Sequence, residues 1–140
     1  MAQFPEGPDA RLTPGALCDQ PDSYRYPEHI PYCSRAVDTQ TKNEVIADYD
    51  HELGYQVEEM NRADFKIDHF IPLCMGGGNV KENLWPQNVS VYTITDPLEP
   101  LACEKMAEGK LKQADAVALI RKGKNDLSTV PSVLQYLNSL

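Results

Sequence analysis

The 140-residue chain has few basic side chains: 13 Lys and Arg stand against 21 Asp and Glu, which gives a formal charge of −8. A charge of this sign excludes the binding of a polyanion through overall attraction, so any contact with nucleic acid depends on a local cluster of cations. The chain also lacks an unbroken apolar run near the ~20 residues that a membrane-spanning helix needs. Its length and its hydrophobic content of 41% predict one globular domain with an ordinary core.

The first eight residues lack the basic cluster and apolar stretch of a signal peptide, so we expect either no such peptide or its removal. The four cysteines occur singly, and the absence of a Cys-x-x-Cys pair argues against structural zinc. Isolated cysteines in even number indicate two disulfides, and of the three possible connectivities we favour Cys18 with Cys33 and Cys74 with Cys103. This favours a secreted or periplasmic protein. Four buried thiols in a cytoplasmic protein are the alternative.

The chain is predicted to fold as an irregular arm over residues 1–35 that packs on a domain of residues 36–140. Six prolines and two glycines fall in the arm and make regular structure there unfavourable. A disulfide across its short Cys18 to Cys33 loop would anchor it by about 3 kcal/mol. After the arm, Thr39 or Thr41 can cap a helix that ends at Gly54.

Residues alternating between apolar and polar predict a strand from Phe65 to Phe70 that ends at Pro72. The glycines at 76–78 supply a turn, and residues 83–85 predict a short returning strand, so the two strands form a hairpin. Three helices are predicted to follow: one capped by Asp96-Pro97 and ended by Gly109, one over Leu111 to Arg121 ended by Gly123, and one from Pro131 to the C-terminus.

Polar chemistry is concentrated in the segments Asp68-His69-Phe70-Ile71-Pro72-Leu73, Gly76-Gly77-Gly78-Asn79 and Glu82-Asn83-Leu84-Trp85-Pro86-Gln87-Asn88. A carboxylate beside a neutral imidazole can hold a hard divalent cation and accept a proton from water, which are the two needs of phosphodiester hydrolysis. A lone Asp-His pair is more often an exposed turn or a structural histidine. We assign that ordinary role to Asp50-His51 and to His29, because neither lies in such an arrangement.

These segments together resemble the HNH nuclease family, and most closely its bacterial branch that reads Asp-His-x-Ile-Pro-Leu, Gly-Gly and Asn-Leu-Trp-Pro-Gln. The match covers about 25 residues, with a spacing of 14 from His69 to Asn83. Weaker similarities in residues 12–15, in the helix of residues 41–49, and at Asp96 with Glu99 extend it. The resemblance implies an α+β fold with a ββα-metal core of hairpin and helix, to which further helices and the irregular arm are added.

The resemblance also implies roles for individual residues. His69 would be the general base that activates water, Asp68 a ligand of a divalent cation, Mg²⁺ or else Mn²⁺, and Asn83 the residue that stiffens the loop and orients the histidine. Tyr92 stands where the family has its second protein ligand. We therefore expect an amide oxygen nearby to replace it, and choose Asn88 over Gln87. The Cys74 to Cys103 disulfide would brace the motif loop against the next helix.

The predicted function is that of a metal-dependent, non-specific endonuclease acting on DNA, with RNA as a second candidate substrate. Arg62, Lys66 and Lys81 flank the motif and are the expected phosphate contacts. One alternative is an inactive HNH-like scaffold that binds protein or nucleic acid, favoured by Tyr92 and the acidic composition. Another is a secreted, disulfide-braced binding module with a coincidental Asp-His pair. We expect a monomer, and the sequence identifies no protein partner.

Overall fold

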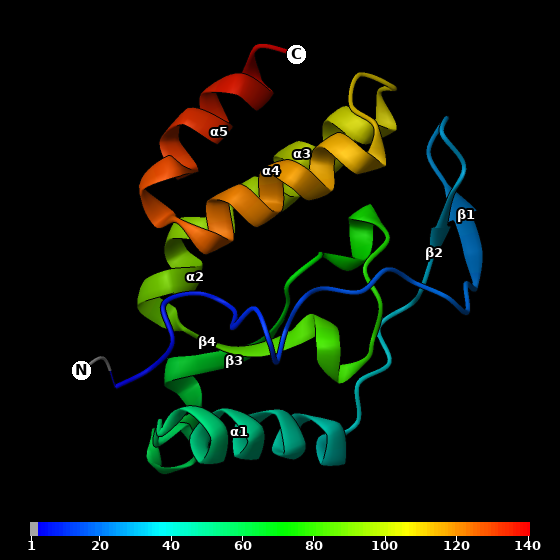
Figure 1. The fold of residues 1–140 in the computed structure, drawn as a ribbon. Helices are drawn as coiled ribbons and strands as arrows, with labels where there is room; N and C mark the ends of the chain where they lie inside the picture. The colour runs from blue at the N-terminus through cyan, green and yellow to red at the C-terminus, as the bar shows by residue number, and fades with distance from the viewer. Residues whose placement is uncertain (1–2) are drawn as a thin grey trace.

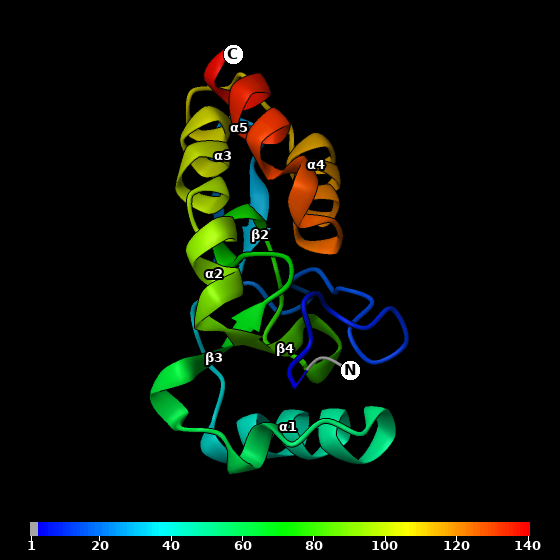
Figure 2. The same ribbon diagram turned by 90° about the vertical axis from the view of Figure 1, so that its left-hand side faces the viewer.

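The computed structural model describes residues 3–140, which form an α+β fold (Figure 1). Its strands make two antiparallel hairpins, one of β1 (Ser23–Arg25) with β2 (Ile30–Tyr32) and one of β3 (Phe65–His69) with β4 (Leu84–Asn88). The helices are α1 (Thr39–Leu53), α2 (Val89–Thr95), α3 (Leu98–Ala107), α4 (Gln113–Asn125) and α5 (Val130–Asn138). The β3–β4 hairpin lies between α1 on one side and α2 to α5 on the other (Figures 1 and 2). None of the helices in residues 3–140 is long and apolar enough to span a bilayer.

The β3–β4 hairpin confirms that two strands pair here, although β4 continues through Pro86 to Asn88 instead of ending at residue 85 as predicted. Phe65 pairs with Asn88 at one end, and His69 pairs with Leu84 at the other. The glycines do not form a tight two-residue turn, however, because the strands are joined by the 14 residues 70–83, which include two short 3₁₀ turns. The hairpin therefore has a long, folded connection at the end that carries His69.

Helix α1 ends as predicted, at Gly54, whose φ of 77° is the left-handed conformation that favours glycine. Its N-terminal cap differs from the prediction. Asp38, rather than Thr39 or Thr41, is the cap, since its Oδ1 accepts a hydrogen bond of 2.7 Å from the Thr41 N–H. Aspartate caps a helix as well as threonine does, so the positions of the threonines alone did not identify the cap residue.

The helices after the hairpin differ from the prediction at two places. Helix α2 was not expected, and Asp96 ends it instead of capping the next helix. Helix α4 continues through Gly123 to Asn125. The reason is packing: a Cβ at position 123 would lie 2.6 Å from Leu98 Cδ1, so the glycine serves close contact between α3 and α4 and does not end the helix.

The arm of residues 3–35 is irregular except for the β1–β2 hairpin, which the prediction did not include. Both disulfides have the favoured connectivity, Cys18 with Cys33 and Cys74 with Cys103, and no cysteine is free. The first closes the arm, and the second joins the 70–83 connection to α3. Two disulfides suit a protein of an oxidising compartment.

The core has two main parts, one on each side of the β3–β4 hairpin. The first is formed mostly by α3, α4 and α5, and Ile71 and Met75 of the 70–83 connection pack into it. In the second, Val45 and Tyr49 of α1 pack with Trp85 of β4. The end of β3 is therefore held between two packed layers, which gives its side chains fixed positions.

Candidate functional site

Asp68 and His69 occupy the last two positions of β3, and both are buried. Neighbouring residues in a regular strand point to opposite faces. The strand ends at His69, however, and both residues border one hollow of about 120 Å³. The two residues predicted to carry the chemistry therefore meet at a common space.

The Asp68 carboxylate is held by two donors. Its Oδ2 accepts hydrogen bonds from Trp85 Nε1 at 2.9 Å and from Lys124 Nζ at 2.8 Å. Lys124 is 3% exposed and also donates to the backbone oxygens of His69 and Phe70, at 2.9 and 3.1 Å. A buried ion pair needs such additional hydrogen bonds to offset the desolvation of its charges. Lys124 thus connects α4 to Asp68 and to the end of β3.

His69 contacts the side chain of Asn79, with 3.0 Å between its Nε2 and Asn79 Oδ1. Burial lowers the pKa of His69, because desolvation disfavours the imidazolium form. The hydrogen bond to Asn79 opposes this effect, and the positive charge of Arg35 adds to it. The imidazole is therefore neutral at pH 7, which is the form that can accept a proton.

Asn83 is completely buried and binds the backbone of the connection between the strands. Its Nδ2 donates to the backbone oxygens of Ile71 and Gly78, at 3.0 and 2.9 Å, and its Oδ1 accepts from the Ile71 N–H at 2.9 Å. These bonds tie the two ends of the connection together, as expected of a loop-stiffening residue. They do not reach the His69 side chain, which Asn79 contacts instead.

The glycines of the connection are required by its tight path. A Cβ at Gly77 would lie 1.8 Å from Ile71 O and 3.0 Å from Asn83 Nδ2. Gly76 has a φ of 92°, a left-handed conformation that side chains rarely adopt. The glycines before Asn79 therefore allow the tight backbone path of the connection beside His69.

A second carboxylate, that of Glu99 on α3, borders the same hollow as Asp68 and His69. Burial raises the pKa of Glu99, while the charge of Lys124 lowers it and that of Asp68 raises it. Glu99 was noted only as a similarity to the family, and no role was assigned to it. Unlike Asn88, from which the sequence led us to expect a ligand oxygen, Glu99 lines the hollow together with Asp68 and His69.

Asp68 and Glu99 could hold a small divalent cation. Among residues 3–140 no three Asp, Glu, His or Cys side chains are grouped to bind a metal. Mg²⁺ does not require such a group, because it keeps several waters and takes one or two carboxylates with phosphate oxygens. Asp68 Oδ1 makes no hydrogen bond within residues 3–140 and is not a buried unpartnered atom, so it is the accessible oxygen of a carboxylate that lines the hollow. The donor set fits Mg²⁺ or Mn²⁺ with water and substrate as further ligands.

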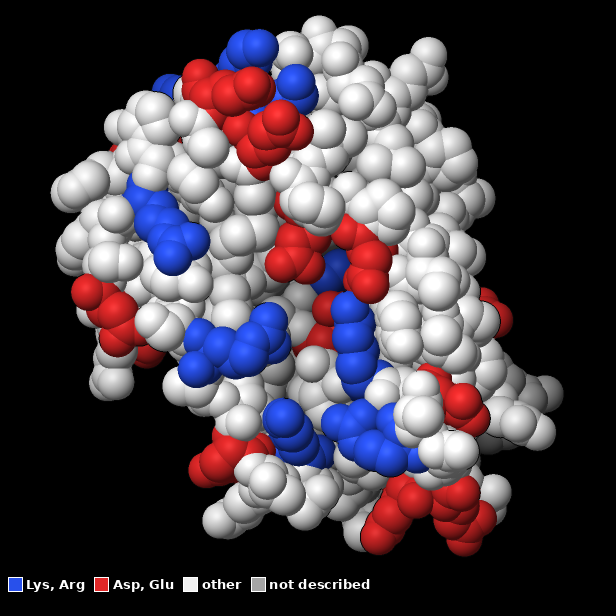
Figure 3. All heavy atoms as spheres, turned by 180° about the vertical axis from the view of Figure 1, so that it is seen from behind, with Lys and Arg blue, Asp and Glu red and all other residues white. Residues whose placement is uncertain are grey.

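Basic side chains surround the hollow next to His69. Arg62 and Lys66, two of the three expected phosphate contacts, line a space of about 230 Å³ together with His69, and Arg35 and Lys42 line it as well. Figure 3 shows Lys and Arg side chains gathered around a recess on this face, with acidic side chains above it. Sequence reasoning missed Arg35 and Lys42, since both lie about 30 residues before the motif.

Lys81 does not belong to this group. It lies beside α1, where its Nζ is 3.4 Å from Asp48 and 3.7 Å from Glu44. The charge of Asp48 raises the pKa of Lys81, as expected of a paired ammonium. The prediction that Lys81 is a phosphate contact is corrected accordingly, because Lys81 lies beside α1 and does not line the space next to His69.

Asn88 also lies apart from the site. It pairs with Phe65 at the end of the hairpin away from His69, and its Oδ1 caps α2 by accepting from the Ser90 N–H at 3.0 Å. Gln87, the alternative, is fully buried in β4 and donates to Thr95 Oγ1 at 2.9 Å. The expectation of an amide ligand is therefore corrected: Asn88 Oδ1 caps α2, and Gln87 Oε1, although it has no hydrogen-bond partner within residues 3–140, is fully buried in the core and does not border the hollow.

The chain was compared with protein-family models, with curated proteins and with solved structures, and none of the three comparisons found a match.

Proposed function

We propose that this protein is a metal-dependent endonuclease of the HNH type, in which the β3–β4 hairpin and the helix after it form a ββα-metal core. The observation that carries the proposal is the common hollow of Asp68, His69 and Glu99, with basic side chains on its rim. A carboxylate pair, a neutral imidazole and cations are the groups that hydrolysis of a phosphodiester requires.

His69 acts as the general base in this proposal. Its Nε2 is bonded to Asn79, and its Nδ1 makes no hydrogen bond in residues 3–140 and is not a buried unpartnered atom. Nδ1 is therefore accessible, and we place it toward the hollow that His69 lines, where it can take a proton from a water molecule. The water oxygen then attacks phosphorus in line, and the bond to the leaving oxygen breaks.

The residues that would hold the cation are Asp68, through Oδ1, and Glu99. When bound, a divalent cation stabilises the negative charge that develops on the scissile phosphate and the leaving oxygen. Lys124 and Trp85 donate to Asp68 Oδ2, so Oδ1 is the carboxylate oxygen that would be free to bind the cation.

The substrate would be held by its backbone phosphates. Arg35, Lys42, Arg62 and Lys66 are the cations of the rim, and none of these contacts depends on the base sequence. Non-specific cleavage of DNA follows, with RNA as a second substrate to be tested. The net charge of −8 makes this local cluster, and not the whole surface, the source of attraction.

One observation favours the alternative of an inactive scaffold that binds nucleic acid or protein. The ammonium of Lys124 already neutralises Asp68, 2.8 Å from Oδ2, and this reduces the attraction of the carboxylate for a metal. A scaffold of this kind would keep the phosphate contacts and lose the reaction.

The test is cleavage of plasmid DNA and of single-stranded RNA by the oxidised protein, with Mg²⁺, with Mn²⁺ and with EDTA. The variants are His69→Ala and, as a matched control, His51→Ala, because Asp50-His51 is the same dipeptide on the exposed end of α1. We expect cleavage with metal by the wild type and by His51→Ala, and its loss with EDTA or in His69→Ala.

Three results would contradict the proposal. Cleavage that survives His69→Ala would show a different active site or a contaminating nuclease. No cleavage with either metal, together with DNA binding that Arg35→Gln weakens, would establish the inactive scaffold. A protein that neither cleaves nor binds nucleic acid would be the disulfide-braced module with a coincidental Asp-His pair.

A further inference from the structure

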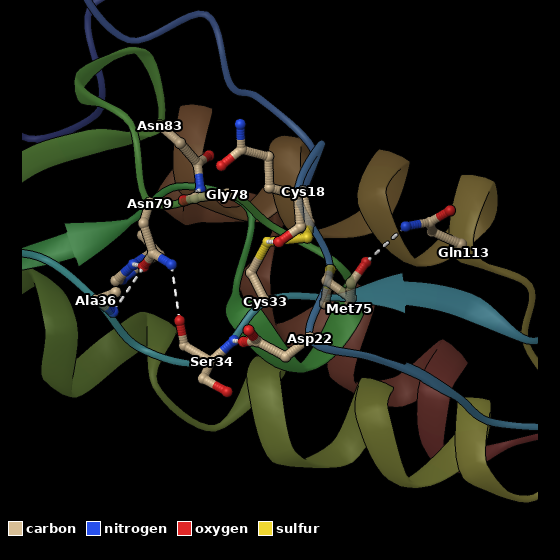
Figure 4. The surroundings of a disulfide bond; sticks show 12 residues. Cys18, Asp22, Cys33, Ser34, Ala36, Met75, Gly78, Asn79, Asn83 and Gln113 are labelled. Atoms are coloured by element: carbon tan, nitrogen blue, oxygen red, sulfur yellow. Dashed lines mark hydrogen bonds between the residues drawn. A yellow bond between two sulfur atoms is a disulfide. The ribbon is translucent and has the colours of Figure 1, made fainter.

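The Asn79 side chain stands between His69 and the arm. Its Oδ1 lies 3.0 Å from His69 Nε2 and accepts a hydrogen bond of 3.3 Å from the Ala36 N–H. Its Nδ2 donates to Ser34 O at 2.7 Å. Figure 4 shows the bonds of Asn79 to Ser34 and Ala36 beside the Cys18–Cys33 disulfide. One amide therefore connects the imidazole to two backbone groups of residues 34–36.

These backbone groups determine which way the amide points. A backbone N–H only donates and a backbone oxygen only accepts, so Ala36 requires Oδ1 on its side and Ser34 requires Nδ2 on the other. An amide rotated by 180° would lose both bonds. The atom that faces His69 is therefore an oxygen.

The orientation of the amide fixes the tautomer of His69. An amide oxygen has no proton to donate, so the proton of the Asn79 to His69 bond belongs to Nε2. In a neutral imidazole with Nε2–H, the lone pair is on Nδ1. That nitrogen makes no hydrogen bond within residues 3–140 and is not a buried unpartnered atom, so it is the accessible nitrogen of a residue that lines the hollow.

The disulfide-closed arm holds the partners of Asn79 in place. Ser34 follows Cys33 directly, and its N–H donates to Asp22 Oδ2 at 2.6 Å. The arm also binds the glycines before Asn79: the Cys18 N–H donates to Gly76 O at 2.8 Å, and Ala16 O accepts from the Gly78 N–H. The arm thus positions the backbone groups that bind Asn79 and also the glycine segment that precedes Asn79.

We propose that Asn79 is the positioning residue of His69, which keeps the proton on Nε2 and leaves Nδ1 as the basic nitrogen, and that the arm closed by Cys18 and Cys33 is a structural part of the active site. The assignment of Nδ1 as the base rests on the proposed function. The tautomer does not, so it can be tested in protein without metal or substrate.

The test is the ¹⁵N shifts of the imidazole nitrogens at a pH where the ring is neutral, which report the nitrogen that carries the proton. The chain has 3 histidines, and His29→Gln and His51→Gln variants assign the third signal to His69. We expect the Nε2–H form in the wild type. Asn79→Leu, which removes the acceptor, should give a mixture of tautomers, while Asn79→Asp keeps an oxygen acceptor and should retain Nε2–H.

Gln113→Leu is the matched control. Gln113 Nε2 donates to Met75 O at 3.0 Å and braces the same connection with an amide that does not touch His69 (Figure 4). Its removal should leave the tautomer unchanged. In the cleavage assay Asn79→Leu should lower the rate about 10- to 100-fold, as loss of a residue that orients a functional imidazole does, and Asn79→Asp should restore part of it.

A wild-type His69 with its proton on Nδ1 would overturn the inference even if the protein is a nuclease. So would an unchanged tautomer in folded Asn79→Leu. If that variant does not fold, the wild-type spectrum and Asn79→Asp still decide the question. The inference and the proposed function can therefore fail separately: the spectrum tests the first, and the cleavage assay with His69→Ala tests the second.

Discussion

Lys124 is the residue on which the geometry of the site depends most. It is buried on α4, far from the motif in sequence, and its three bonds join Asp68 to the backbone of the two following residues. Removal of one partner of a buried ion pair leaves the other charge without compensation, which costs more than the pair itself contributes. The Lys124–Asp68 pair therefore both stabilises the fold and fixes the position of Asp68.

Lys124→Met is expected to lower the free energy of unfolding by about 3–5 kcal/mol, because Asp68 would stay buried without its counterion. Urea unfolding followed by circular dichroism measures this change. Lys122→Met, an exposed lysine on the same helix, is the control and should change stability by less than about 0.5 kcal/mol. Adding Asp68→Asn to Lys124→Met should recover part of the loss. Equal effects of the two lysine variants would contradict the role of the pair.

The lowered pKa of His69 predicts how stability depends on pH. Above pH 6.5 the imidazole is neutral in the folded and the unfolded chain. As the pH falls below 6.5, the unfolded chain binds a proton that the buried ring of the folded protein resists, so stability decreases until the folded pKa is reached. Burial of the ring contributes most to this window; the charges of Arg35 and Lys124 widen it, and the hydrogen bond to Asn79 and the charge of Asp68 narrow it.

Urea unfolding in EDTA at about pH 7.5 and about pH 5.5 tests this dependence. The wild type should lose more stability between the two conditions than His69→Gln, which cannot take up the proton. His51→Gln, at an exposed position on α1, should behave as the wild type does. A wild type and a His69→Gln variant with the same loss would show that burial does not shift this pKa.

At the scale of elements, the connection of residues 70–83 shapes the site, and its path depends on glycines. Gly77→Ala should disrupt it, because the new Cβ would lie 1.8 Å from Ile71 O and the backbone has to move. Gly78→Ala meets Leu17 O at 3.1 Å and requires a smaller shift, so it should cost less stability and less activity. Thermal unfolding and cleavage rates compare the two variants. A larger effect at Gly78 would contradict this account.

Local patterns predicted the elements whose signals are short-range. Alternation gave the β3–β4 hairpin, and Gly54 gave the end of α1. Helix α2 was missed because its sequence, VSVYTIT, is rich in β-branched residues that favour strands. It forms because Asn88 caps it and Val91 packs in the core. Gly123 was taken as a helix end because its contact with Leu98 cannot be seen from neighbouring residues.

At the candidate site, too, local patterns identified neighbouring residues but not those that come from distant parts of the chain. The motif alone identified Asp68, His69 and Asn83, which lie together around the connection. Lys124, Arg35 and Glu99 come from other elements, and their approach depends on how α3, α4 and the arm pack. Asn88 and Lys81 were misplaced for the converse reason. They are near the motif in sequence, but a strand of five residues separates Asn88 from His69, and α1 pairs with Lys81.

At the scale of the whole molecule, the chain is acidic but its rim beside His69 is basic. The charge of −8 repels a nucleic acid at long range, whereas Arg35, Lys42, Arg62 and Lys66 attract it at the hollow. Lys66 is partly neutralised by Asp96 at 2.8 Å, while Arg35 and Lys42 make no salt bridge within residues 3–140. These two should therefore contribute most to phosphate binding.

The salt dependence of DNA binding distinguishes the local cluster from the overall charge. Four cations limit the slope of log affinity against log salt to about −4 for duplex DNA, since each phosphate contact contributes about 0.9. In EDTA, to prevent cleavage, Arg35→Gln with Lys42→Gln should make the slope shallower by about 2. Arg11→Gln with Lys110→Gln changes the net charge equally, but both cations are paired with glutamates outside the hollow. If the two double variants weaken binding alike, net charge governs the interaction; if only the first does, the DNA lies across the rim beside His69.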